Sequence, residues 1–182
     1  MFAPDLYVAA LQFAAERHAG QKVPGSGLPY VVHLTSVAAE VIAALPESGL
    51  DADLAVACAL LHDVIEDTVK TDPERQQVGE QVTARFGPAV AAGVWALTKA
   101  ESVAKADRMA DSLRRIRAQP REVWAVKLAD RITNLAPPPS HWTTEKRAAY
   151  RAEAITIADA LGEANARLHA RIREKIAAYA AY

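Results

Sequence analysis

Residues 54–67 read LAVACALLHDVIED, and this stretch decides the fold. The eight residues before His62 are apolar on every face of a helix, a pattern that indicates a helix buried on all sides. Four ionisable residues then follow: His62, Asp63, Glu66 and Asp67. Because spacings of three and four residues return to one helix face, these side chains fall within an arc of about 140°. The stretch therefore predicts a buried helix that continues to Asp67 and carries a polar cluster at its end.

The polar cluster needs a compensating charge. Three carboxylates and an imidazole in apolar surroundings repel one another or become protonated unless a cation neutralises them. One helix rarely completes a metal site, so further ligands are expected from elsewhere, and the candidates are His33 in PYVVH and Asp130 in WAVKLADRITNL. Two imidazoles and two carboxylates suit Mn²⁺, Fe²⁺ or Zn²⁺ and disfavour Ca²⁺. The structural alternatives are a hydrogen-bonded His62–Asp63 pair and a local ion pair between Asp130 and Arg131.

Helix-start and helix-stop signals recur along the rest of the chain. Pro4 can open a first helix that Gly20 closes, and Thr143 can cap a long amphipathic helix. Abundant alanine favours helix, whereas the one short β-branched run, Val31–Val32, is too brief for a strand in a sheet. We therefore expect a compact all-α bundle of about eight to nine helices.

The composition indicates one domain, residues 1–182. The chain has 182 residues, of which 51% are hydrophobic, enough for one sizeable core. Its formal net charge is −1, so it lacks the basic surface that would favour a nucleic acid polymer or a membrane. A single cysteine, Cys58, excludes an intramolecular disulfide, and no stretch resembles a signal peptide or a membrane span. We expect a cytoplasmic protein; its oligomeric state is not indicated.

The order of three motifs carries a family resemblance. PYVVH (residues 29–33), HDVIEDT (62–68) and KLADRITNL (127–135) together resemble the pattern of HD-domain phosphohydrolases. With FAAERHAGQK and RFGPAVAAGVWALTK, the chain resembles the hydrolase domain of the RelA/SpoT family, specifically its stand-alone small alarmone hydrolases, the Mesh-type (p)ppGpp 3′-pyrophosphohydrolases. The resemblance covers residues 5–175 and implies the helical bundle of an HD domain.

The resemblance also implies a site and a reaction. The family's metal ligands match His33, His62, Asp63 and Asp130, and its usual ion is a single Mn²⁺. Its acidic pair, which positions and helps to activate water, matches Glu66 and Asp67, and its substrate-binding asparagine matches Asn134. The implied reaction is attack of water on the 3′-pyrophosphate of (p)ppGpp or a close analogue such as (p)ppApp, releasing GDP or GTP (or the adenosine equivalent) and pyrophosphate.

Two predicted loops, Gly20–Tyr30 and Ala136–Trp142, depart from the family pattern where substrate is read. Lys22 is followed by Val23 and Pro24 instead of a basic run, and Ala136 begins a triple proline instead of an arginine. The candidate phosphate partners are Lys22, Lys127, Arg131, Lys146 and Arg147. Two other functions therefore stay open: a nucleotide 2′- or 3′-phosphatase, for example acting on NADPH, and an HD domain that binds nucleotide without turnover. The roles of His18 and of the His141–Trp142 segment also stay open.

Overall fold

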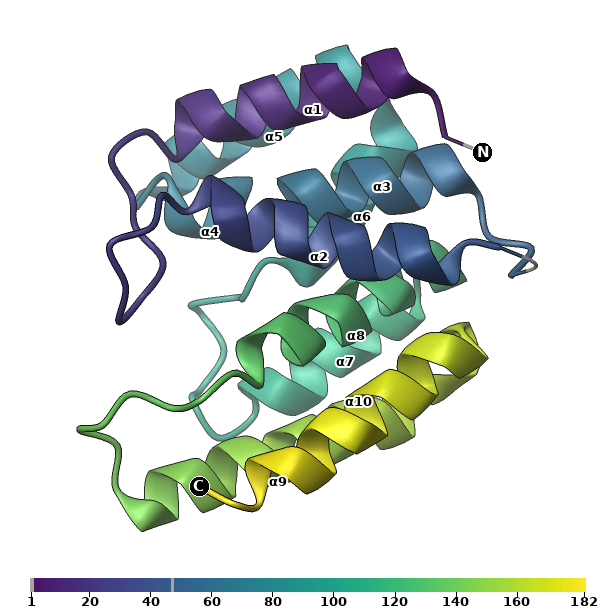
Figure 1. The fold of residues 1–182 in the computed structure, drawn as a ribbon. Coiled ribbons are helices and arrows are strands. Elements are labelled where there is room, and N and C mark those ends of the chain that lie inside the picture. The colour runs from purple at the N-terminus through teal and green to yellow at the C-terminus, as the bar shows by residue number, and fades with distance from the viewer. Residues whose placement is uncertain (1, 47) are drawn as a thin grey trace.

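The computed structural model describes residues 2–46 and 48–182, which form an all-α bundle (Figure 1). Apart from the single turn α4, each helix has at least ten residues, so the expected all-α bundle of about eight to nine helices is confirmed. The helices are α1 (Pro4–Arg17), α2 (Val31–Ala44), α3 (Ala52–Leu61), α4 (Val64–Asp67), α5 (Asp72–Phe86), α6 (Pro88–Leu97), α7 (Arg108–Arg117), α8 (Arg121–Asn134), α9 (Thr144–Leu161) and α10 (Ala166–Tyr179).

Helix α3 is the centre of the bundle. Every residue from Ala55 to Leu61 is buried, and α3 packs against α1, α2, α6 and α8. Figure 1 shows the surrounding layers: α1 and α5 lie above α3, α7 and α8 lie below it, and α9 and α10 cover the base. Asp51 caps the start of α3 by accepting hydrogen bonds from the backbone N–H groups of Asp53 and Leu54.

The prediction that this helix continues to Asp67 is wrong. α3 ends at Leu61, His62 and Asp63 form a turn, and α4 begins at Val64. In a continuous helix the Ala59 carbonyl would accept a hydrogen bond from the Asp63 N–H. Here it accepts one from the His62 ring instead, over 2.8 Å between Nδ1 and the oxygen. The polar cluster therefore lies at a break between two helices.

Both predicted loops lie at the end of the bundle where this break occurs. The segment between α1 and α2 and the segment between α8 and α9 both project at the left-hand end of Figure 1, near α4. The first loop is closed by an isolated antiparallel bridge between Lys22 and Pro29. Among the described helices, none combines the length and apolar composition needed to cross a membrane. The loops and the helix break thus share one open end.

Close packing of α6 on the core depends on Gly93. A Cβ atom at this position would lie 2.7 Å from Cys58 Sγ and 2.9 Å from Val123 Cγ2. Cys58 is fully buried, as its place in an apolar run predicts, and burial raises the pKa of its thiol to about 12. Gly93 therefore lets three helices approach at a point without free space.

We predict that Gly93→Ala lowers the free energy of unfolding by about 1–3 kcal/mol, because the added methyl group overpacks the contact between α3, α6 and α8. Thermal denaturation followed by circular dichroism measures the effect as a lower Tm. Gly27→Ala is the matched control, since its Cβ would meet no atom within 4 Å. Equal Tm values for the two variants would contradict this account of the core.

Candidate functional site

Three parts of the fold bring the four predicted metal ligands together. His33 lies in the first turn of α2, His62 and Asp63 form the break after α3, and Asp130 lies near the end of α8. His62 Nε2 is 2.9 Å from Asp63 Oδ2 and 3.8 Å from Asp130 Oδ1. His33 Nε2 is 3.6 Å from Asp63 Oδ2 and 3.5 Å from Asp130 Oδ1. His33, His62 and Asp130 each place one ligand atom within 4.8 Å of the others, and Asp63 borders this group through its contacts with both imidazoles.

The His62 ring has one nitrogen suited to a metal. A carbonyl oxygen only accepts hydrogen bonds, so the contact with Ala59 requires the proton on Nδ1. In the neutral ring, Nε2 then carries a lone pair; this atom is buried and makes no hydrogen bond with the described residues. It faces a carboxylate oxygen of Asp63, which is also an acceptor. A cation between these atoms removes the repulsion, so this donor set fits a divalent metal ion.

The charges at the cluster are strongly coupled. Burial lowers the pKa of the His62 imidazole, but Asp63 and Asp130 outweigh it and raise this pKa to about 9. Burial raises the pKa of Asp63, and the charge of His62 overcomes this effect and lowers it to about 2. For Asp130, burial is likewise overcome, here by Lys127 and the two imidazoles, which hold its pKa well below the usual value. Positive charge at this point therefore stabilises the ionised acids.

Tyr30 supports Asp63 from the loop before α2. Its hydroxyl donates a hydrogen bond to Asp63 Oδ2 over 2.7 Å. Burial, reinforced by the nearby Asp63 charge, raises the pKa of the phenol, so that the hydroxyl stays protonated and able to donate. The sequence analysis gave Tyr30 no role, although it stands in the PYVVH motif three residues before His33.

A hydrogen-bonded chain leads from α1 to Asp67. The His18 ring stacks on the Tyr30 ring at a centroid distance of 4.8 Å, and its Nδ1 lies 2.8 Å from Gln21 Oε1. Gln21 Nε2 then donates to Asp67 Oδ2 over 2.9 Å. Because an amide oxygen only accepts, the His18 Nδ1 must carry a proton. His18 thus fixes the orientation of the Gln21 amide that holds Asp67.

Lys99, just after α6, holds Glu66. Its backbone N–H donates to Glu66 Oε2 over 2.8 Å, and its ammonium group forms an ion pair with Glu66 Oε1. Burial lowers the pKa of Lys99, but Glu66 together with Asp63 and Asp130 outweighs this effect and raises it, so the lysine stays charged. The sequence analysis missed Lys99, although it ends the quoted motif RFGPAVAAGVWALTK.

The polar side chains at the end of α8 point in different directions. Lys127 Nζ lies 3.0 Å from Asp130 Oδ2, and Asn134 Nδ2 donates to Asp130 Oδ1 over 2.6 Å. Arg131 turns away, because it lies about 100° around the helix from Asp130. Its guanidinium carbon lies 4.3 Å from the centre of the Tyr150 ring, and its Nη2 lies 3.5 Å from a Glu153 oxygen.

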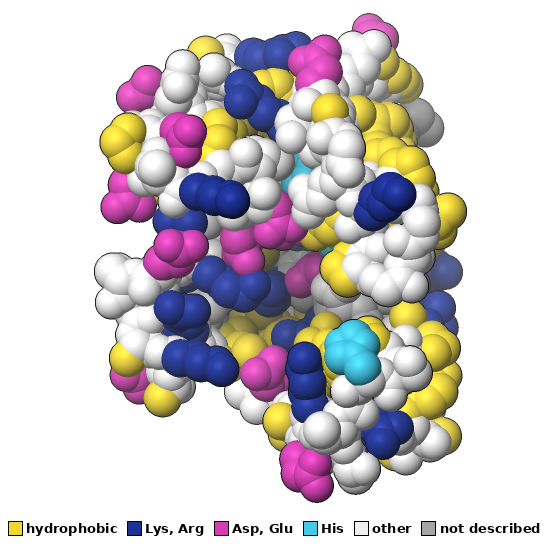
Figure 2. Space-filling view, turned by 90° about the vertical axis from the view of Figure 1, so that its left-hand side faces the viewer, with side chains coloured by type: hydrophobic (Ala, Val, Ile, Leu, Met, Phe, Trp, Pro, Cys, Tyr) yellow, Lys and Arg dark blue, Asp and Glu magenta, His cyan; other side chains and the backbone are white. Residues whose placement is uncertain are grey.

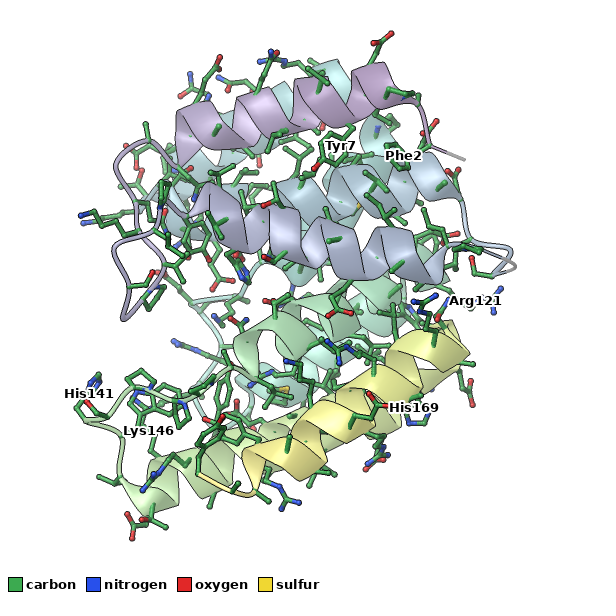
Figure 3. The ribbon with its side chains drawn as sticks, in the orientation of Figure 1. Phe2, Tyr7, Arg121, His141, Lys146 and His169 are labelled. Atoms are coloured by element: carbon green, nitrogen blue, oxygen red, sulfur yellow. The ribbon has the colours of Figure 1, made fainter. Side chains whose placement is uncertain are left out.

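The other candidate phosphate partners lie outside the site. Lys22 is exposed, Arg147 donates a hydrogen bond to Thr144, and Lys146 Nζ lies 4.3 Å from the centre of the Trp142 ring. Figure 3 shows Lys146 and His141 at the outer end of the loop before α9, with His169 on α10, far from that loop. Lys22, Arg131 and Arg147 line neither of the two hollows described next. Their contacts with substrate therefore stay predictions.

Two adjoining hollows lie at the cluster. The inner one, of about 220 Å³, is lined by Tyr30, His33, His62, Asp63, Glu66, Asp67, Leu97, Lys99, Lys127, Asp130 and Asn134. The outer one, of about 720 Å³, shares His33 and Asn134 with it and extends between the two loops. Figure 2 looks onto the open end and shows acidic side chains gathered inside the hollowed surface, with Lys and Arg side chains beside them. Such a site suits a phosphorylated small molecule.

Comparisons with known proteins agree with this geometry. Residues 10–165 match the model of the HD domain family. The chain is 30% identical to the guanosine-3′,5′-bis(diphosphate) 3′-pyrophosphohydrolase MESH1 of Drosophila melanogaster, covering 92% of this chain and 91% of that protein. It is 35% identical to the guanosine-3′,5′-bis(diphosphate) 3′-pyrophosphohydrolase of Aquifex aeolicus, over 69% of this chain but 17% of that protein.

A similar structure has also been solved. It is that of a metazoan orthologue of SpoT that hydrolyses ppGpp, with a TM-score of 0.79 and 28% sequence identity over 96% of both chains. Several relatives are much longer: the chain spans 17% of the Aquifex protein and 20% of a GTP pyrophosphokinase from Myxococcus xanthus. The two nearly full-length matches are therefore the informative ones for a chain of this size.

We predict that a divalent transition-metal ion raises the Tm of protein that has been stripped with a chelator, because it relieves the repulsion among the buried acceptors. At a free concentration of one hundred times Kd, the gain is about 2.7 kcal/mol. Differential scanning fluorimetry measures it, with K⁺ at equal ionic strength as the control. An equal response to both ions would contradict a specific divalent site.

Proposed function

This chain belongs to the HD-domain family, and on that premise we propose that it hydrolyses the 3′-pyrophosphate of (p)ppGpp or of a close analogue such as (p)ppApp. The single observation that carries the proposal is the buried His–Asp cluster with an unpartnered His62 Nε2, placed beside the carboxylates of Glu66 and Asp67. The relative and the solved structure that match nearly the whole chain are named for ppGpp hydrolysis, which supports the same conclusion.

An HD domain binds a divalent metal ion, and the chain has a His–His–Asp cluster for it. We assign His33, His62, Asp63 and Asp130 as the ligands of one ion and Mn²⁺ as that ion. The mixed nitrogen and oxygen donors support this choice. When bound, such an ion polarises a phosphoryl oxygen and makes a water molecule more acidic. Tyr30 then orients Asp63, while Lys127 and Asn134 orient Asp130.

The acids next to the cluster handle the attacking water. Glu66 and Asp67 line the inner hollow, where they orient a water molecule and accept its proton. The water oxygen bonds to the phosphorus attached to the 3′ oxygen, the bond between this oxygen and phosphorus breaks, and the 3′ oxygen takes up a proton. The products are GDP or GTP and pyrophosphate. Lys99 and Lys127 neutralise charge on the phosphates.

The residues at the rim of the outer hollow support a second candidate function, that of a nucleotide 2′- or 3′-phosphatase. Val23, Pro24 and Ala136 line it in place of basic residues, so a 2′- or 3′-phosphate of another nucleotide, such as NADPH, is the alternative substrate. The released product separates the two functions: pyrophosphate identifies the first and orthophosphate the second. Cytoplasmic location and a single domain over residues 1–182 stay predictions.

We predict that the protein with Mn²⁺ releases pyrophosphate from ppGpp, and that NADPH gives little orthophosphate. Incubation with ppGpp, ppApp and NADPH, followed by ion-exchange chromatography, identifies the products. Intact ppGpp together with rapid release of orthophosphate from NADPH would replace the first function by the second.

Two variants separate the proposed roles in the same assay. Asp63→Ala should lose metal and turnover together, because it removes a ligand. Glu66→Gln should retain metal and lose at least about a hundredfold in kcat, because it removes a proton acceptor. Metal content is measured by inductively coupled plasma mass spectrometry. Full activity of Asp63→Ala would refute the ligand assignment.

We predict that His18 acts through Gln21 on Asp67. His18→Leu should lower kcat about tenfold with little change in KM or metal content, because the Gln21 amide loses the donor that orients it. His18→Asn should recover much of kcat, since its amide nitrogen can donate from a similar position. If His18 only filled space, the two variants would lose stability without differing in kcat.

A further inference from the structure

The outer hollow has aromatic and apolar walls. It shares His33 and Asn134 with the inner hollow, so a nucleotide whose phosphate is held at the His–Asp cluster has the outer hollow beside it. Trp142, Tyr150 and Tyr179 contribute aromatic surface to its walls, and the segment Pro137–Pro139 adds apolar surface. The Trp142 and Tyr150 rings already pack edge to face at a centroid distance of 5.2 Å. Aromatic and apolar walls of this kind take nucleobases by stacking.

The charges on these walls favour a base over a phosphate group. Among the described residues that line the outer hollow, Lys175 is the one basic residue of the lysine or arginine type, and Glu40 is the one residue with a carboxylate. The lysines near phosphate, Lys99 and Lys127, instead line the inner hollow. A polyphosphate needs several cations, whereas a carboxylate repels it. The outer hollow therefore receives the uncharged end of the substrate.

Glu40 is placed to reach that end. It follows His33 by seven residues on α2, so the two side chains share one helix face and are separated by about 10 Å along the axis. This separation is comparable to the span of a nucleoside 3′-phosphate from its phosphorus to the Watson–Crick edge of the base. Ser36 lies between them on the same wall.

The Glu40 carboxylate is bound by Arg171 but can still accept hydrogen bonds from a ligand. Arg171 donates to Oε1 from Nε and Nη2, over 3.4 and 3.3 Å, which fixes the position of the carboxylate. Oε2 has no hydrogen bond with the described residues, and the side chain is 23% exposed at the hollow. Since each carboxylate oxygen accepts two hydrogen bonds, Arg171 fully engages Oε1, and Oε2 retains capacity for a ligand.

We propose that Glu40 is a specificity-determining residue that selects guanine over adenine, an inference that rests on the proposed function. Guanine presents two adjacent donors, N1–H and the N2 amino group, which can both donate to Glu40 Oε2. Adenine presents a donor, the N6 amino group, beside an acceptor, N1. N1 then faces the Glu40 carboxylate with no proton between the two acceptors. Pairing two acceptors in a partly buried place costs affinity, so the adenine nucleotide is disfavoured.

Glu40→Gln tests the inference with almost no change in shape. The amide offers one acceptor and one donor, which suit adenine better than guanine. We expect the ratio of kcat/KM for ppGpp to that for ppApp to fall about tenfold to a hundredfold. Glu174→Gln is the matched control, because Glu174 also contacts Arg171, at 3.8 Å, but lies outside the hollow. It should leave the ratio unchanged.

The outcomes separate this inference from the proposed function. If the wild type hydrolyses ppGpp and Glu40→Gln leaves the ratio as it was, the role of Glu40 is refuted while the proposed function stands. If the wild type hydrolyses neither nucleotide, the proposed function fails. Glu40 is then tested by isothermal titration calorimetry of guanosine and adenosine 3′-monophosphates with the Mn²⁺-loaded proteins. Equal binding preference in the wild type and Glu40→Gln would overturn the inference there too.

Discussion

The hydrogen bond from His62 Nδ1 to the Ala59 carbonyl is the contact on which the site depends. It lies on the carbonyl that the Asp63 N–H would bond in a continuous helix, at the point where α3 ends and the chain turns. The same bond puts the proton on Nδ1 and leaves Nε2 directed at the carboxylates. Because α3 is surrounded by α1, α2, α6 and α8, its end is also where side chains from these neighbours meet. One contact at the helix end thus sets a tautomer and the direction of a ligand.

Charge balance explains which side chains gather around this helix end. Asp63, Asp130, Glu66 and Asp67 line one small hollow, and four carboxylates in such a space repel strongly. Lys99 and Lys127 form ion pairs with two of them, Glu66 and Asp130. Asp63 lies against His62, whose raised pKa reflects the negative charge around it, and a bound cation would take over that compensation. The elements that carry the lysines, α8 and the segment after α6, are therefore part of the site as much as those that carry the ligands.

The parts of this structure that follow from the sequence are those encoded by local patterns. The all-α fold follows from alanine content and caps, and the convergence of His33, His62, Asp63 and Asp130 follows from motif order. The break at His62 was missed because hydrophobic periodicity registers the apolar surroundings and not a side chain that captures a backbone carbonyl. Lys99, Gln21 and Glu40 were missed because their partners lie on elements far away in the chain. Each of them looks like an ordinary surface residue until the helices are packed.

The two hollows differ in how they are built, and this difference bears on specificity. The inner one is formed largely by helices packed on α3, where a shift of one residue would disturb the core. The outer one is bounded on one side by two loops containing Val23, Pro24 and Pro137–Pro139, which tolerate substitution more readily. Its opposite wall is α2, the helix that also carries His33. A residue on that helix, such as Glu40, is held in fixed register with the metal cluster, whereas a loop residue is not. Recognition of the base from α2 therefore couples the choice of nucleotide to the position of the reacting phosphate.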